Sequence, residues 1–212
     1  LSEANDHGYR LGLYGGYSQG AFGLETYLDY GRQNSHSTRY LQDLTLQSRQ
    51  ATSNYSSSTL SFGLTARYNL HHGTDKLWQV SPYADFHLTR YNQDAYSERG
   101  ADELSQIADR FANTYSTGAV GLEMARTIHK GRYAIHVGYK RVLSGGNPDM
   151  IIAYSGAPVS KLTIRGSETD KESFVLGLSL QGEVAKNWTV DGQLTSETGR
   201  TGSSLTASIT LR

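Results

Sequence analysis

The sequence predicts an all-β protein, an antiparallel transmembrane β-barrel of the outer-membrane type, on the basis of three observations. Apolar and polar residues alternate along most of the chain, as they do in strands with one apolar and one polar face. Charged residues lie in the middle of the polar faces, and aromatic residues lie near the ends of the apolar faces. Long and short polar segments alternate between the candidate strands, as outer loops and short turns alternate in such barrels.

Composition narrows the class of protein further. The chain has 212 residues, no cysteine and a formal net charge of zero. The absence of cysteine excludes a disulfide scaffold and a cysteine metal site, and the charge balance argues against a nucleic-acid partner. The longest apolar runs, such as Met150–Tyr154, are far shorter than a membrane helix requires. A hydrophobic content of 37% is low for a soluble domain, and it fits a barrel in which only the outer face is apolar.

Nine strands are expected from the alternation. In Leu60–Tyr68 every even position is apolar or aromatic, and every odd position is small, polar or charged. The same period of two appears in eight further segments: Leu11–Ser18, Phe22–Tyr30, Val80–Thr89, Val120–Ala125, Tyr133–Lys140, Phe174–Gln181, Trp188–Thr195 and Ser204–Arg212. The best candidate for a helix is Ala101–Phe111, which has apolar residues at helical spacing and would lie in a loop.

The two faces of these strands predict two environments. The polar face would line the lumen of the barrel, with nine charged or histidine residues: Glu25, Asp29, Arg67, Asp85, His87, Glu123, His136, Lys140 and Asp191. The apolar face would contact lipid, with an aromatic girdle at headgroup level formed by Tyr17, Tyr30, Tyr68, Tyr133, Tyr139 and Trp188. The alternative is a secreted β-sandwich, in which the apolar faces form a central core and the charges are ordinary surface charges.

The lengths of the connections predict the orientation. Gln19–Gly20, Asn69–Gln79, His129–Arg132 and Glu183–Asn187 are short, whereas Arg32–Ser58, Arg90–Thr117 and Arg141–Ser173 are long. Because short turns face the periplasm in outer-membrane barrels, the long loops are expected to be extracellular and the C-terminus periplasmic. The first strand would then start outside the cell. Since bacterial barrels normally have an even number of strands, an odd number of strands is expected upstream of the first.

Two short motifs in the middle of the chain carry a resemblance to a known family. The strand Ser81–Phe86 contains Pro82, Tyr83 and Ala84, and the segment Arg90–Ala101 contains Tyr96, Glu98 and Gly100. This order resembles the signature of autotransporter (type V secretion) β-domains, where a Pro-Tyr-Ala strand precedes an aromatic-X-Glu-X-Gly-Ala element. Leu11–Tyr17, Tyr27–Gly31 and the closing strands are also similar to that family, so the resemblance covers nearly the whole chain.

The resemblance implies a 12-stranded barrel that anchors and supports export of an N-terminal passenger polypeptide. Residues 1–212 would then be a single translocator domain that lacks its first three strands, its pore helix and its passenger. The implied partners are outer-membrane lipid, the barrel-assembly machinery and the protein's own passenger segment, with no cofactor, and the barrel would be a monomer. Glu98 matches the family's glutamate and would brace a loop against the wall. Family members usually end on an aromatic residue, whereas this chain ends Leu211-Arg212.

No motif predicts catalysis or metal binding. No strand-to-helix nucleophile elbow is predicted, and Ser144-Gly145-Gly146 reads as a turn. His71 and His72 are adjacent in a polar turn with no further ligands in view. Some autotransporters cleave their passenger with lumen carboxylates, but the cleavage segment is absent here, so Asp29, Asp85 and Glu123 are not assigned as catalysts.

Three functions therefore follow from the sequence. The first is a translocator barrel, whose lumen charges either keep the wall from gripping a passing polypeptide or simply hydrate it. The second is a small outer-membrane porin or an adhesin barrel with exposed outer loops. The third is an outer-membrane enzyme, which no motif in the sequence supports.

Overall fold

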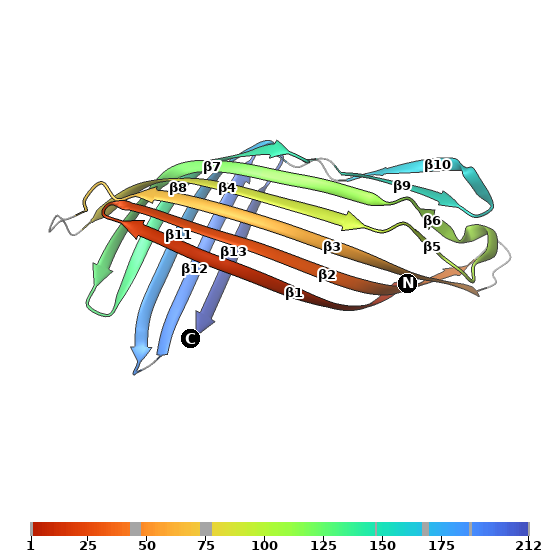
Figure 1. Ribbon diagram of the computed structural model, residues 1–212, viewed down its shortest axis with the longest axis horizontal. Helices are drawn as coiled ribbons and strands as arrows, with labels where there is room; N and C mark the ends of the chain where they lie inside the picture. The colour runs from red at the N-terminus through yellow and green to blue at the C-terminus, as the bar shows by residue number, and fades with distance from the viewer. Residues whose placement is uncertain are drawn as a thin grey trace.

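The protein folds around one antiparallel sheet of nine strands (Figure 1). The computed structural model describes residues 2–42, 48–72, 78–146, 148–166, 170–186 and 188–211. Within them the sheet follows chain order and consists of β1 (Ser2–Gln19), β2 (Phe22–Gln42), β3 (Ser48–Tyr68), β4 (Gln79–Gln93), β7 (Phe111–Ile128), β8 (Gly131–Ser144), β11 (Glu172–Ala185), β12 (Trp188–Gly199) and β13 (Ser203–Leu211). The predicted fold class and the nine strands are confirmed.

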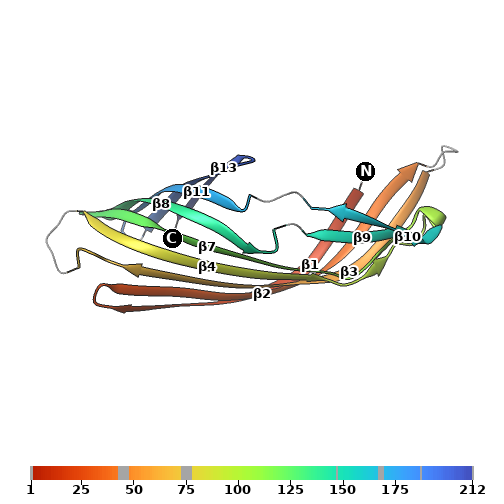
Figure 2. The same ribbon diagram turned by 90° about the horizontal axis from the view of Figure 1, so that it is seen from above.

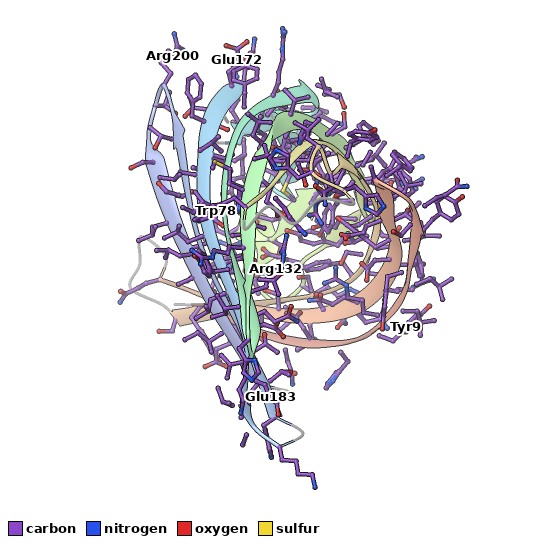
Figure 3. The ribbon with its side chains drawn as sticks, turned by 90° about the vertical axis from the view of Figure 1, so that its left-hand side faces the viewer. Tyr9, Trp78, Arg132, Glu172, Glu183 and Arg200 are labelled. Atoms are coloured by element: carbon purple, nitrogen blue, oxygen red, sulfur yellow. The ribbon has the colours of Figure 1, made fainter. Side chains whose placement is uncertain are left out.

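The sheet curls strongly, so that it forms an open half-barrel (Figures 1 and 3). β1 and β13 are the two edges of the sheet, and the described residues of these strands do not pair with each other. Residues of both edge strands are exposed along their length. The curled sheet therefore has a concave face, a convex face and two unpaired edges.

Short turns gather at one end of the sheet, here called the hairpin end. β1 and β2 are joined by Gly20 and Ala21, and Gly20 has a φ of 57°, a conformation that glycine adopts without steric cost. His129 and Lys130 join β7 to β8 at the same end. The predicted turns between β3 and β4 and between β11 and β12 fall partly on residues 73–77 and 187, which lie outside the described residues.

The opposite end, here called the loop end, carries long extensions of the strands. β2 and β3 each have 21 residues and stay paired from Phe22↔Tyr68 to Gln42↔Ser48. The polar segment Arg32–Ser58, expected to be a connection, is therefore mostly paired strand. Figure 2 shows the two strands bending away from the body of the sheet toward this end.

A second sheet lies at the loop end. It has the order β10 (Ala157–Arg165), β9 (Asp149–Tyr154), β6 (Gln106–Ala108) and β5 (Tyr96–Ser97), so that the connections β4–β7 and β8–β11 pair with each other. The helix expected over Ala101–Phe111 is wrong: the segment forms a 3₁₀ turn at Asp102–Leu104, then β6, and Phe111 starts β7. Asp102 has a φ of 48°, which a continuous α-helix does not allow. No described helix is long and apolar enough to cross a membrane.

The buried core is small and made of small residues. In the described part of the chain no large side chain is fully buried, and the buried hydrophobic residues are Ala51, Ala101, Ala108, Ala125, Ala134, Ile152 and Ala153. Most large apolar side chains lie exposed on the convex face instead. A sandwich would bury those side chains in a central core, so the structure excludes the sandwich alternative.

Candidate functional site

The concave face is polar and forms the wall of a hollow. Strand register places the odd residues of β4, such as Tyr83, Asp85 and His87, beside residues of β3 and β7 on the same face. The hollow has a volume of about 780 Å³. Of the nine residues predicted to line the lumen, seven line this hollow: Arg67, Asp85, His87, Glu123, His136, Lys140 and Asp191. Glu25 and Asp29 lie on the same face of β2, because they pair in register with Thr65 and Ser61.

Ion pairs cross between the strands of this face. The Arg10 Nε donates to Asp29 Oδ2 at 2.7 Å, and Arg67 Nη1 donates to Glu25 Oε1 at 3.0 Å. Further along the curl, Arg132 Nη2 donates to Glu123 Oε1 at 2.5 Å (Arg132 is labelled in Figure 3). Lys140 Nζ lies 2.9 Å from Glu197 Oε2, and the Ser173 hydroxyl donates to the same carboxylate. These cations are neutralised by carboxylates of the adjacent strand or, for Lys140, of the next strand but one, so the wall presents dipoles and compensated charge to the hollow.

Aromatic rings lie close against glycines on the same face. A Cβ added at Gly63 would overlap the ring of Tyr27, and a Cβ at Gly177 would overlap the ring of His136. The Tyr83 ring lies over both Gly121 and Gly138. Only glycine leaves room for a ring at this distance from the strand. These contacts could not be predicted from the sequence, because each ring and its glycine lie on different strands.

The convex face is apolar and carries the six predicted girdle residues. Tyr17, Tyr68, Tyr133 and Trp188 lie toward the hairpin end, whereas Tyr30 and Tyr139 lie toward the loop end. Tyr30 lies near Tyr9, with ring centroids 6.3 Å apart, and Tyr139 lies near Phe174 at 5.7 Å. Trp78, which lies just outside the predicted strand Val80–Thr89, adds to the row at the hairpin end and packs edge-on against Tyr133, with ring centroids 5.5 Å apart. The aromatic residues thus form two rows that bracket an apolar band.

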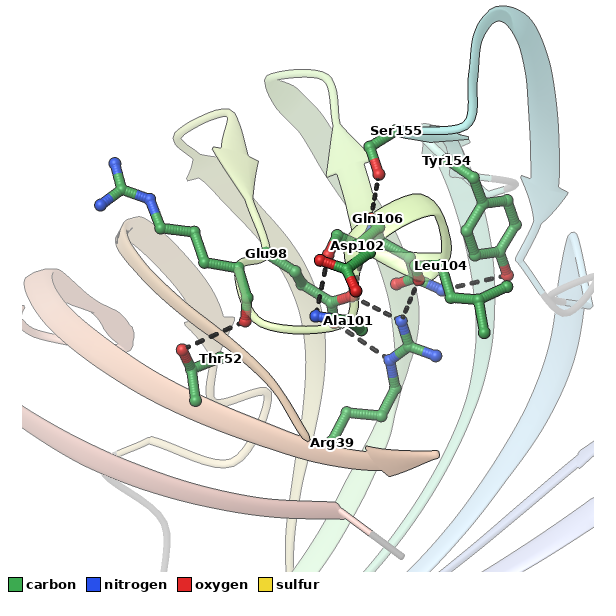
Figure 4. A network of polar contacts seen from close by, with 11 residues as sticks. Arg39, Thr52, Glu98, Ala101, Asp102, Leu104, Gln106, Tyr154 and Ser155 are labelled. Carbon is green, nitrogen blue, oxygen red and sulfur yellow. Dashed lines mark hydrogen bonds and ion pairs between the residues drawn. The ribbon is translucent and has the colours of Figure 1, made fainter. Parts of the chain in front are cut away.

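At the loop end, a network of polar contacts docks the β4–β7 connection onto the extension of β2 and β3 (Figure 4). Arg39 Nε and Nη2 donate to Glu98 Oε1 and Oε2 at 3.0 and 2.5 Å. The Glu98 carboxylate also accepts from the Gln106 backbone N–H at 2.8 Å, and Arg39 Nη2 also donates to the Leu104 carbonyl at 3.0 Å. The hydrogen bond to Glu98 raises the pKa of Arg39. Glu98 therefore joins β2 to the β4–β7 connection.

The other motif residues lie around this network and on β4. The Tyr96 ring stacks on Tyr55 with centroids 4.9 Å apart, and burial raises the pKa of Tyr96. Gly100 has a φ of 98°, and a Cβ there would lie 2.5 Å from the Gln50 carbonyl. Pro82 and Ala84 lie on the convex face of β4, opposite the face of Tyr83.

The described residues show no arrangement for metal binding or for nucleophilic catalysis. No group of three or more His, Cys, Asp or Glu side chains in them could hold a metal ion. His71 Nδ1 lies 2.9 Å from the Trp78 carbonyl, so its ring is tied to its own turn. The Ser144 hydroxyl lies 2.8 Å from the Ser116 hydroxyl and 3.3 Å from the Thr114 carbonyl, and neither serine hydrogen-bonds to a histidine of the described residues.

Comparison with known proteins gives a family and a fold. The family model described as "Autotransporter beta-domain" matches residues 1–195. Among solved structures, the "Translocator domain of autotransporter NalP from Neisseria meningitidis" is similar, with a TM-score of 0.66 and 14% sequence identity. The match covers 98% of this chain and 66% of that chain. A comparison with curated proteins found no match.

Proposed function

Since the chain belongs to the autotransporter β-domain family, we propose that this outer-membrane translocator barrel anchors an N-terminal passenger polypeptide and supports its export. The hairpin end faces the periplasm in this proposal, and the loop end with its second sheet faces the outside of the cell. Membrane lipid surrounds the convex face, and the barrel-assembly machinery inserts the protein.

The direction of the two edge strands carries the proposal. β1 runs from the loop end to the hairpin end, and β13 runs the same way, because seven antiparallel strands lie between them. Direct pairing of the two edges would be parallel, and an antiparallel cylinder therefore needs an odd number of further strands. Three would complete the 12-stranded family barrel. Each unsatisfied backbone group of an unpaired edge in lipid costs several kcal/mol. The open edges of β1 and β13 therefore strongly favour further strands between them.

The concave wall suits a passing polypeptide. An extended chain in the lumen must exchange its hydrogen bonds with water or with the wall as it moves. Cations such as Arg67 and Lys140 already have carboxylate partners, so they offer a moving chain no strong isolated charge. The polar wall keeps the lumen hydrated, and the passage needs no specific binding site.

Cell-surface display tests the proposal. An epitope tag is placed in the region upstream of residue 1 of the full gene product, and intact cells are probed with antibody and with external protease. Surface labelling of the tag, and its loss when the strands upstream of β1 are deleted, is the expected result. A tag that stays inside cells whose barrel is correctly assembled would overturn the export function.

A porin or adhesin barrel is the second candidate, and the exposed second sheet is the observation that favours it. β10 is exposed along its whole length, as an adhesive loop would be. The gene upstream of residue 1 separates the two functions: a signal peptide followed directly by further strands, with no passenger, supports the porin or adhesin. Catalysis is not proposed, because no described group of residues supplies a nucleophile with its base.

A further inference from the structure

The arginines and lysines of the nine-stranded sheet differ between the two faces in whether they pair with a carboxylate. On the concave face, every described arginine or lysine of the nine strands pairs with a carboxylate: Arg10 with Asp29, Arg39 with Glu98, Arg49 with Asp102, Arg67 with Glu25, Arg132 with Glu123, and Lys140 with Glu197. The concave wall therefore satisfies its own cations. The convex face differs: Arg126, toward the hairpin end, is half-buried and has no carboxylate of the described residues within ion-pair distance.

Three further arginines of the convex face are exposed and lie toward the loop end. No carboxylate of the described residues lies within ion-pair distance of Arg32 or Arg90. Arg141 has only a 3.9 Å contact with Glu172, and both side chains are more than half exposed. An exposed pair at that distance is worth little. Three guanidinium groups therefore point outward from the sheet with their donors largely unused.

Their position on the strands is equivalent. Arg32 follows Tyr30 by two residues on β2, Arg90 follows Leu88 on β4, and Arg141 follows Tyr139 on β8. Each is thus the first convex residue beyond the apolar band at the loop end. On β4 the convex residues from Val80 to Leu88 span about 27 Å along the strand, or about 20 Å with the tilt typical of barrels, which is close to the height of a membrane-facing band.

Two of the arginines flank the same strand. Arg32 lies across from Ser58 of β3, and Arg90 lies across from Leu60 of β3. Because β2 and β4 are two strand spacings apart, the two backbones are about 10 Å apart. Long side chains from both can reach a group above Ser58, which adds a hydroxyl to the same convex surface.

We propose that Arg32, Arg90 and Arg141 bind the anionic phosphate groups of lipids in the membrane leaflet at the loop end. The inference rests on the proposed function, which places a membrane around the convex face and lipid headgroups at the loop-end border of the apolar band. A guanidinium offers a planar fork of donors that matches two phosphate oxygens. At headgroup level, next to aromatic side chains, that fork meets phosphate rather than protein carboxylate. The arginines then fix the depth of the barrel in the bilayer from one side.

Native mass spectrometry tests the lipid site on the full gene product purified from outer membranes. The protein is reconstituted in nanodiscs of phosphatidylcholine that contain either diphosphorylated lipid A or the same lipid with its phosphates removed, and the retained lipids are counted. The parent protein should retain the phosphorylated form in preference. The triple variant R32Q/R90Q/R141Q should lose that preference by about tenfold or more, since one basic residue near a lipid surface changes binding by about fivefold.

A matched control removes the same charge elsewhere. Arg99 and Arg110 in the β4–β7 connection and Arg165 at the end of β10 are also exposed and lie at the loop end beyond the proposed site. The variant R99Q/R110Q/R165Q should therefore keep the lipid preference. A triple variant at the proposed site that keeps the full preference, or a parent protein that shows none, overturns the inference. Passenger display is measured on the same variants. Normal display without lipid preference removes only the lipid site, and lipid preference without display in the parent removes only the export function.

Discussion

Arg39 and Glu98 form a two-pronged ion pair between the extension of β2 and the β4–β7 connection, with nitrogen–oxygen distances of 3.0 and 2.5 Å. The Glu98 side chain is only 7% exposed, and that of Arg39 is 23% exposed. The same carboxylate holds the first backbone N–H of β6. Arg99, next to Glu98, pairs through its backbone with Thr52 of β3. Glu98 therefore ties β2 to the start of β6, next to the backbone bridge between Arg99 and β3.

Glu98→Ala should loosen this connection without unfolding the sheet. Removing one partner leaves a partly buried guanidinium uncompensated, which costs about 3 kcal/mol. Amide hydrogen exchange at Thr52, Arg99 and Gln106 should become about a hundredfold faster as the connection undocks, whereas amides in the middle of β3 should keep their protection.

The ion pair Lys161–Asp109 supplies the control for that change. It also lies at the loop end, but its side chains are 58% and 44% exposed, so Asp109→Ala should cost less than about 1 kcal/mol. Equal effects of the two substitutions would contradict the bracing role of Glu98. Arg39→Ala should resemble Glu98→Ala, and the double variant should add little to either.

The contact of His136 with Gly177 gives a second prediction. A methyl group at position 177 would overlap the imidazole ring, so Gly177→Ala must displace the ring into the hollow. Overpacking of this kind costs about 1–3 kcal/mol. Urea unfolding of the full gene product in detergent, followed by heat-modifiable gel mobility, should show the loss, and His136→Ala in the Gly177→Ala background should restore most of it.

Gly23 is the matched control for Gly177. It lies on the concave face of β2, and an added Cβ there meets nothing within 4 Å. Gly23→Ala should therefore leave the urea midpoint unchanged or raise it slightly, because alanine loses less backbone entropy on folding than glycine. If Gly23→Ala destabilises the barrel as much as Gly177→Ala, the effect is one of strand glycines in general.

The period of two was enough to predict the wall of the barrel. In Leu60–Tyr68 it separates the faces correctly, and register carries that separation across the sheet from Leu28 to Phe62 and Leu88. The face of a residue depends only on whether its position in the strand is odd or even, and this can be read from a single sequence. The ion-pair partners of two predicted lumen residues were missed, namely Arg132 for Glu123 and Glu197 for Lys140. An ion pair between strands depends on their register, and register is set by turns and bulges.

The second sheet could not be predicted for a different reason. β6 is three residues long and pairs with β9, more than forty residues later in the chain. Its apolar residues Ile107 and Ala108 fall at helical spacing with Leu104 and Phe111 by chance, and this spacing led to the wrong prediction of a helix. A polar contact decides the outcome: the Glu98 carboxylate takes the backbone N–H of Gln106, which holds that segment extended. A long-range carboxylate is not visible in a local pattern.

The two tryptophans test the aromatic row at the hairpin end. Trp78 packs on Tyr133, and Trp188 starts β12; they are the only tryptophans of the chain. Aromatic girdles lie at headgroup level, so brominated lipids should quench both tryptophans most strongly when bromine is near the headgroup. Trp78→Phe and Trp188→Phe separate the two signals. Strongest quenching from the bilayer centre, or none at all, would remove the girdle at that tryptophan.

Asp170 gives a prediction for pH. It accepts from the Thr201 backbone N–H at 3.0 Å, and hydrogen bonds to Thr201 hold the pKa of this carboxyl below its usual value of 3.8. A carboxyl with a lowered pKa stabilises the docked turn at any pH above its unfolded value, and loses that effect as pH falls through the folded pKa. The protection factor of the Thr201 amide, which corrects the exchange rate for its intrinsic pH dependence, should therefore be constant near neutral pH and fall only in acid below 3.8. Asp170→Asn should remove this pH dependence, because its amide does not ionise; an unchanged acid transition in that variant would assign the transition to another group.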